Sequence, residues 1–243
     1  MLRFLTSGES HGPVLIAIID GLPAGLPLDV ELINSELRRR QHGYGRGSRQ
    51  KIESDSVESI TGVRQGITTG APVAISIVNR DWQNWRHVMS VAPVDLSQPE
   101  VAEQLKKKAI GRFRPGHADL PGTLKFRHQD IRDVLERASA RETAARVAVG
   151  AVCQQLLAQF GILISASVIQ VGQVRAALPA EIDLAELEER IAGSELFCAD
   201  AAAEEAMKAL IKSAWQEGDS LGGVVDVLVD GLPVGLGTYT QWD

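Results

Sequence analysis

The chain has 243 residues, of which 44% are hydrophobic and 23% are charged, so its composition is that of a soluble globular protein and not of a disordered or fibrous one. Its two cysteines, Cys153 and Cys198, have neither the number for a disulfide framework nor the spacing for a zinc site, so we expect a reducing compartment and no metal. No signal peptide or membrane span is visible in the sequence, which makes the cytoplasm the expected location.

The net charge is −6, but the charges are distributed unevenly. Residues 38–51 carry six Lys or Arg and residues 106–117 carry five, with no acid in either segment. Such segments focus a positive field on an acidic protein, as a site for a small, multiply charged anion requires. A nucleic acid is the alternative ligand that this pattern leaves open.

The first segment of interest is GESHG, residues 8–12, which precedes a predicted strand at 14–19. A histidine between small residues, such as His11, can approach a ligand and exchange a proton near neutral pH. A turn histidine that only hydrogen-bonds to the backbone is an equally good interpretation of this segment.

The basic segment at 38–51 has glycines at positions 43, 45 and 47, which predict a loop on which several arginines converge on one anion. The planar guanidinium group suits this role because it binds carboxylate and phosphate through two hydrogen bonds. A solvated surface loop or a contact to nucleic acid remains the alternative, although Tyr44 alone offers little for base stacking.

A second strand is predicted at 72–78, and the segment RFRPGHAD follows it at 112–119. Pro115 and Gly116 predict a turn that presents Arg114 and His117 together, a second acid–base candidate beside an anion binder. The alternative is an ordinary surface turn after a basic helix end.

A long helix is predicted at 140–160, ended by Gly161. Ser139 and Glu142 form a capping box in which Ser139 accepts from the third helical N–H and Glu142 reaches back. The Ala- and Val-rich stretch at 144–152 predicts burial on more than one face, hence a central helix. Arg137 and Arg141 are spaced to face one anion at the amino end of this helix, unless they merely decorate its cap.

Two further strands at 163–171 and 223–229 and a helix at 199–216 complete the predicted elements. Residues 14–27 align with residues 224–237 at seven of fourteen positions, which indicates two copies of one strand–turn unit. We therefore predict an α+β fold, a layered sandwich of antiparallel sheets and central helices with pseudo-symmetric halves and no linker between them. Neither a G-x-G-x-x-G after a strand nor a P-loop is present.

Four of these motifs together resemble chorismate synthase and occur in that family's order: GESHG from Gly8, RRQHGYGRGSRQ from Arg39, RPGHAD from Arg114 and RASARET from Arg137. The resemblance extends to NRDWQNW from Asn79, to GDSLGG from Gly218 and to the final GLGTYTQWD, so it covers the whole chain. It implies the chorismate synthase fold in a single domain spanning 1–243, C-terminally incomplete relative to the family, which continues into a further region.

The resemblance implies a carbon–oxygen lyase of the shikimate pathway of aromatic amino-acid biosynthesis. The reaction would be the 1,4-elimination of phosphate from 5-enolpyruvylshikimate 3-phosphate to give chorismate, with reduced FMN but no net redox change and with NADPH as a candidate reductant. It implies a homotetramer whose partner is this small molecule, not a nucleic acid or a membrane. The alternative is a non-catalytic fragment of the same family that binds the anionic substrate.

The same resemblance assigns roles to individual residues. His11 resembles the acid that assists departure of phosphate, and His117 the group that protonates the reduced flavin. Substrate binding is implied for five arginines: Arg40, Arg46, Arg49, Arg114 and Arg141. Arg40 and Arg46 also match positions assigned to NADPH, and Arg137, Ala138 and Ser139 resemble a flavin-contacting stretch.

Overall fold

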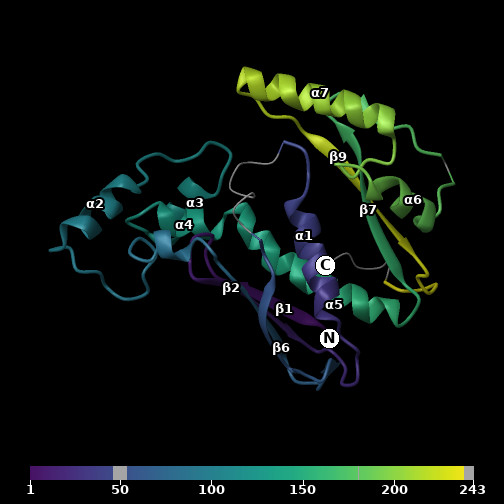
Figure 1. Cartoon of the computed structure of the whole chain (residues 1–243), viewed down its shortest axis with the longest axis horizontal. Helices are drawn as coiled ribbons and strands as arrows, with labels where there is room; N and C mark the ends of the chain where they lie inside the picture. The colour runs from purple at the N-terminus through teal and green to yellow at the C-terminus, as the bar shows by residue number, and fades with distance from the viewer. Residues whose placement is uncertain (46–53, 180, 238–243) are drawn as a thin grey trace. The chain divides into compact units, whose positions relative to one another are not determined.

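Residues 1–45, 54–179 and 181–237 are described by the computed structural model of the chain (Figure 1). The chain divides into a first unit, residues 1–41 and 48–152, and a second unit, residues 42–47 and 153–243. The boundary falls inside helix α5 (Thr143–Ala158), so both units share one continuous helix.

The first unit contains an antiparallel sheet whose described strands run in the order β1 (Arg3–Ser7), β2 (Val14–Asp20), β6 (Val73–Val78) and β3 (Val57–Thr61). Alternation along the inner strands decides which face is buried. On that face β2 and β6 are paired directly, Leu15 with Ile77, Ala17 with Ile75 and Ile19 with Val73. All six side chains are buried, so this face forms the core of the unit.

Helices complete the first unit. Helix α1 (Val30–Gln41) buries Ile33 and Leu37, one turn apart on the same face. Six of the seven apolar residues of α5 between positions 144 and 152 are also buried, as predicted, and Val147 is half-buried. The remaining short elements are β4 (Val63–Arg64), β5 (Ile67–Thr68), η2 (Trp82–Asn84), α2 (Pro99–Lys107), α3 (Asp119–Phe126), α4 (Arg132–Arg137) and η3 (Ala140–Glu142).

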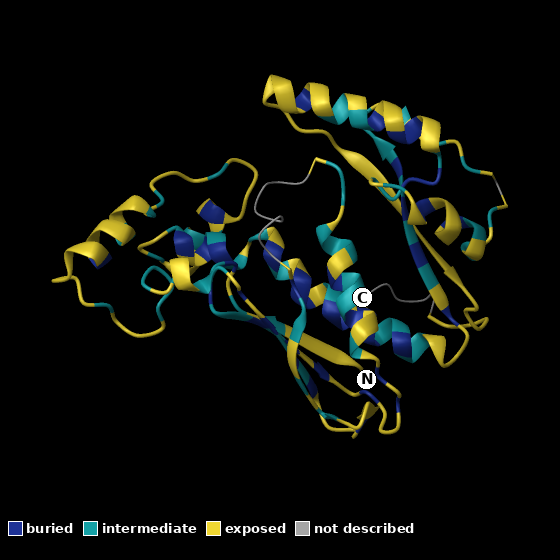
Figure 2. Cartoon of the chain, in the orientation of Figure 1, coloured by how far each residue is buried: buried dark blue, intermediate teal, exposed yellow. Residues whose placement is uncertain are grey.

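The second unit pairs β7 (Leu163–Val171) with β8 (Val174–Arg175) on one side and with β9 (Gly223–Asp230) on the other, both antiparallel. Its helices are α6 (Leu184–Ala192) and α7 (Ala201–Glu217). Met207 of α7 is fully buried in a cluster with Cys198 and Ala203, and Val168 of β7 packs against it. All eight residues of β9 are exposed (Figure 2).

The four predicted strands are confirmed to within one residue at each end, as β2, β6, β7 and β9. Both copies of the repeated segment are strands that end at a glycine in the left-handed region, Gly21 at φ 92° and Gly231 at φ 75°. The copies differ in position, because β2 lies inside its sheet and β9 is an outer strand among those described. The α+β class with antiparallel sheets is confirmed.

The two predicted helices are confirmed with corrected ends. The first begins as the 3-10 turn η3 and continues as α5, and the second is α7, capped by Asp200 and ended by Gly218 at φ 71°. The Ser139 hydroxyl accepts from the N–H of Arg141, one position earlier than predicted. The carboxylate of Glu142, expected to complete the capping box, instead accepts from Thr6 and Arg146. Within the described ranges, no helix is both long and apolar enough to cross a membrane.

Candidate functional site

His11 lies on the loop that joins β1 to β2, and the first residue of this loop must be glycine. Gly8 has a φ of 102°, and a Cβ there would lie 2.3 Å from the carbonyl oxygen of Val14. Any other residue would therefore strain the backbone and collide with the start of β2. Beside His11, the buried Ser10 donates its N–H to the carbonyl oxygen of Glu136 at 3.0 Å, which docks the loop on the end of α4.

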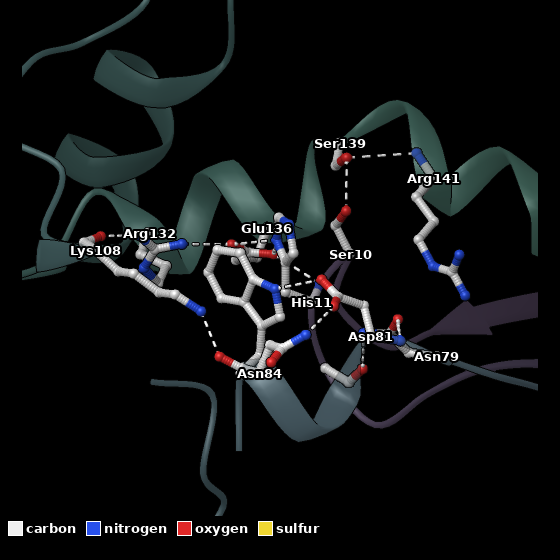
Figure 3. A network of polar contacts seen from close by, with 12 residues as sticks. Ser10, His11, Asn79, Asp81, Asn84, Lys108, Arg132, Glu136, Ser139 and Arg141 are labelled. Carbon is white, nitrogen blue, oxygen red and sulfur yellow. Dashed lines mark hydrogen bonds and ion pairs between the residues drawn. The ribbon is translucent and has the colours of Figure 1, made fainter. Parts of the chain in front are cut away.

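The carboxylate of Glu136 binds His11 at two points (Figure 3). The ring Nδ1 lies 2.7 Å from Oε2 and 2.9 Å from Oε1, and the backbone N–H of His11 donates to Oε2 at 2.9 Å. Arg132, one turn earlier on α4, donates to Oε1 at 2.7 Å. Glu136 is fully buried, so these partners replace the water that a carboxylate otherwise needs.

The same contacts decide the charge of Glu136. Burial alone would raise the pKa of this carboxyl group, but the hydrogen bonds and charge of His11 and the hydrogen bond from Arg132 lower it below its ordinary value. Glu136 is therefore an ionised acceptor at neutral pH and presents a negative charge to the imidazole.

Trp85 covers the imidazole of His11, with ring centroids 3.6 Å apart and planes 30° from parallel. The indole N–H donates to Asp81 at 2.8 Å, which fixes the ring. The Lys108 ammonium lies 3.7 Å from the centroid of the indole and also donates to the carbonyl oxygen of Asn84. Burial lowers the pKa of Lys108. A histidine, an indole and a lysine thus form one stack beside the Glu136 carboxylate.

The segment NRDWQNW, residues 79–85, holds the far end of the His11 loop. The Asn79 amide donates to the carbonyl oxygen of Gly12 at 2.9 Å, and its backbone N–H donates to that of Pro13 at 2.9 Å. Asn79 is buried, and its own carbonyl group starts the turn that carries Trp85. This explains why a motif far from His11 in sequence belongs to the same site.

Arg40 and Arg141, two of the predicted substrate-binding arginines, converge on Asp55. Arg40 lies 2.7 Å and Arg141 2.9 Å from its carboxylate oxygens, and all three side chains are nearly buried. Arg141 also donates to the carbonyl oxygen of Val78, the residue before Asn79, at 3.4 Å. The structure therefore brings these two arginines together next to the segment that holds the His11 loop.

Arg114 and His117 lie on the predicted turn. The N–H of His117 donates to the carbonyl oxygen of Arg114, and Gly116 has a φ of 74°, as a type II turn requires. Arg114 binds the buried Asp119 through Nε and Nη2, which lowers the pKa of Asp119 to about 2. His117 is exposed.

The predicted flavin-contacting stretch, Arg137, Ala138 and Ser139, faces the β1–β2 loop. Arg137 donates to the carbonyl oxygens of Thr6 and Gly8, at 2.8 and 3.1 Å. The Ser139 hydroxyl donates to the hydroxyl oxygen of Ser10 at 3.0 Å. Ala138 is exposed. Arg137 and Arg141 thus have different partners within the protein.

Arg46 and Arg49 lie outside the described residues. Sequence analysis also missed four residues that the structure places around His11: Trp85, Lys108, Arg132 and Glu136. Glu136 directly precedes the RASARET motif, but Asp133 and Glu142 lie among the same arginines, so the sequence does not single out Glu136. Trp85 is the last residue of the NRDWQNW motif, but no pattern in the sequence links it to His11.

The arrangement suits proton transfer near an anion. His11 is bound at Nδ1, so Nε2 is the ring nitrogen left to exchange a proton with a ligand. Lys108 and Arg132 add positive charge around the Trp85 ring that stacks on His11, which favours an anionic group in this region. Among the described residues, no group of three His, Cys, Asp or Glu side chains has the geometry to hold a metal ion.

The chain is similar to known proteins over its whole length. The family model described as chorismate synthase matches residues 2–243. A chorismate synthase from Geobacter sulfurreducens is 54% identical and one from Desulforamulus reducens 52% identical over 243 residues, with all of this chain and 60% and 61% of the relatives covered. A structure titled "Crystal Structure of Chorismate Synthase" matches with a TM-score of 0.76 and 40% identity, over 99% of this chain and 62% of that one. The chain therefore spans about 60% of the length of these relatives.

Proposed function

The chain belongs to the chorismate synthase family, and from this premise we propose that it is a carbon–oxygen lyase acting on 5-enolpyruvylshikimate 3-phosphate. The reaction is the 1,4-elimination of phosphate to give chorismate. The observation that carries the proposal is the pairing of His11 with the buried carboxylate of Glu136, which also binds Arg132.

His11 acts as the acid that assists phosphate departure. The charged imidazole holds Nδ1–H on Glu136 and gives its Nε2 proton to the leaving phosphate oxygen. Arg132 and Lys108 lower the electrostatic cost of the dianion that forms. The stack on Trp85 keeps the ring in one orientation, so the proton is delivered in one direction.

The arginines hold the anionic groups of the substrate, which has one phosphate and two carboxylates. Asp119 accepts from two of the five donors of Arg114, whose side chain remains 35% exposed, so the guanidinium group can also bind a ligand oxygen. The pairing of Arg40 and Arg141 with Asp55 fixes a second basic centre in place. Arg46 and Arg49 are proposed for the same role on the resemblance alone.

We propose that reduced FMN binds beside His117, and the exposure of this residue on the turn after Arg114 supports the proposal because a ligand can reach it. Arg137 is less suited to direct contact, because it already binds the loop carbonyls, so we propose that it and Ser139 support the flavin site by holding that loop. When bound, reduced FMN supplies electron density that eases cleavage of the allylic carbon–oxygen bond without net redox change. We also propose that NADPH binds at Arg40 and Arg46 as the reductant. The protein is proposed to form a homotetramer and to be located in the cytoplasm.

An anaerobic assay tests this function. The chain is incubated with 5-enolpyruvylshikimate 3-phosphate and chemically reduced FMN, and chorismate absorbance and released phosphate are followed together. We expect both products to appear in step. Calorimetric binding of the substrate with no product would favour the alternative, a non-catalytic anion-binding member of the family, and neither binding nor turnover would contradict both.

A further inference from the structure

Glu136 holds His11 and its neighbour through three separate hydrogen-bonded groups. Its carboxylate accepts from the ring and from the backbone N–H of His11, and its carbonyl oxygen accepts from the N–H of Ser10. The backbone contacts fix the loop, and the ring contact fixes rotation of the imidazole about its side-chain bonds. A residue that only stabilised the loop would not need the ring contact.

The ring contact also decides which nitrogen carries the proton. An ionised carboxylate accepts hydrogen bonds and cannot donate one, so the hydrogen in the contact belongs to Nδ1 of His11. In a neutral imidazole, Nε2 then has the lone pair, and in the charged imidazole Nε2–H is the acid. A free neutral histidine has its proton mainly on Nε2, so this carboxylate inverts the ordinary tautomer.

Glu136 itself cannot turn away from His11. It is fully buried, and Arg132 at the preceding turn donates to Oε1 while also donating to the carbonyl oxygen of Lys108. Two further charged groups contact Trp85, which stacks on the imidazole: Lys108 lies over the indole ring, and Asp81 accepts from the indole N–H. The hydrogen bond with Asp119, and to a smaller extent the charge of Glu136, raises the pKa of Arg114.

We propose that Glu136 is the positioning residue of His11, setting both its tautomer and its direction of proton delivery. The inference rests on the proposed function of His11 as an acid. During the elimination, the Nε2–H bond breaks, its proton passes to the phosphate oxygen and its electron pair stays on Nε2, while Nδ1–H remains on Glu136. The carboxylate keeps its charge throughout and stabilises the imidazolium before transfer.

The first test needs no variant and no turnover. Long-range proton–nitrogen NMR spectra of the chain with 15N-labelled histidine identify which ring nitrogen of neutral His11 carries hydrogen, with His11 assigned through its bonds to the backbone. We expect Nδ1–H. A proton on Nε2 would overturn the proposal, whatever the enzymatic activity of the chain.

Glu136→Gln provides the second test, because the amide can donate to Nδ1 and so releases the tautomer. We expect the Nε2–H form to increase and kcat to fall by about 10- to 1,000-fold with a smaller change in KM. Glu136→Asp, which keeps the negative charge, should retain part of the Nδ1–H tautomer and part of kcat. Glu204→Gln is the matched control, because Glu204 is also buried and accepts backbone N–H bonds, but in the second unit.

The outcomes separate this inference from the proposed function. An Nδ1–H tautomer that shifts in Glu136→Gln, in a chain without turnover, supports the positioning role and contradicts the lyase activity. An unchanged tautomer or unchanged kcat in a folded Glu136→Gln overturns the positioning role. If that variant does not fold, the tautomers of the wild-type chain and of Glu136→Asp decide the question.

Discussion

At the scale of single residues, buried carboxylates organise the cations of this site. Glu136 binds Arg132 and His11, Asp55 binds Arg40 and Arg141, and Asp119 binds Arg114. Each carboxylate is almost inaccessible to solvent. Neighbouring cations repel each other, so Asp55 and Glu136, which each bind two basic side chains, lower the electrostatic cost of keeping those two side chains together.

Asp119 gives a prediction with a defined pH range. Its pKa falls from 3.8 to about 2 through Arg114, so its contribution to stability is complete above pH 3.8 and is lost as the pH falls towards 2. Asp119→Asn should cost on the order of 1–3 kcal/mol at neutral pH and flatten the loss of stability across this range. Urea unfolding at several pH values measures both effects.

The control is Asp133→Asn, which changes an aspartate whose side chain is 56% exposed. It should keep the wild-type dependence of stability on pH. Equal slopes for wild type and Asp119→Asn would show that the ion pair with Arg114 does not stabilise the fold.

At the scale of helices and strands, the predictable elements are those with a local pattern. Apolar runs rich in Val and Ile mark β2 and β6, and Asp200 and Gly218 mark the ends of α7. Strand β1 was not predicted from the sequence, because four of its five residues are exposed and they show no alternation of apolar and polar residues. Helix α1 was not predicted either, because only Ile33 and Leu37 are buried and give a weak apolar pattern. Its last turn is a run of arginines, which the sequence analysis interpreted as part of a loop.

The N-terminal cap of α7 allows a test of whether these local patterns contribute to the free energy of unfolding. The Asp200 carboxylate accepts from the N–H groups of Ala202 and Ala203 at the helix start and from that of Ala177. Asp200→Ala should therefore lower the free energy of unfolding by about 1 kcal/mol, whereas Asp200→Asn, which keeps one oxygen for the two helix N–H groups but loses the bond from Ala177, should lower it less. Urea unfolding of the two variants checks this, and an equal loss in both would contradict a capping role.

At the scale of the whole chain, the family was recognisable from motifs, but the contacts among the motifs were not. The residues GESHG, NRDWQNW and RASARET are far apart in sequence and meet through Gly12, Asn79 and Ser139. Glu136 could not be assigned from its spacing, because its partner lies 125 positions away and only the fold makes them neighbours. Long-range hydrogen bonds of this kind leave no periodic trace in a sequence.

If His11, held by Glu136, is the acid that releases phosphate, its removal should slow phosphate release without weakening substrate binding. Phosphate release from 5-enolpyruvylshikimate 3-phosphate is therefore compared between the wild-type chain and His11→Ala, under anaerobic conditions with reduced FMN. We expect turnover to fall by about 100- to 10,000-fold while the calorimetric affinity for the substrate changes little. Equal rates of phosphate release by the two proteins would show that His11 is not this acid.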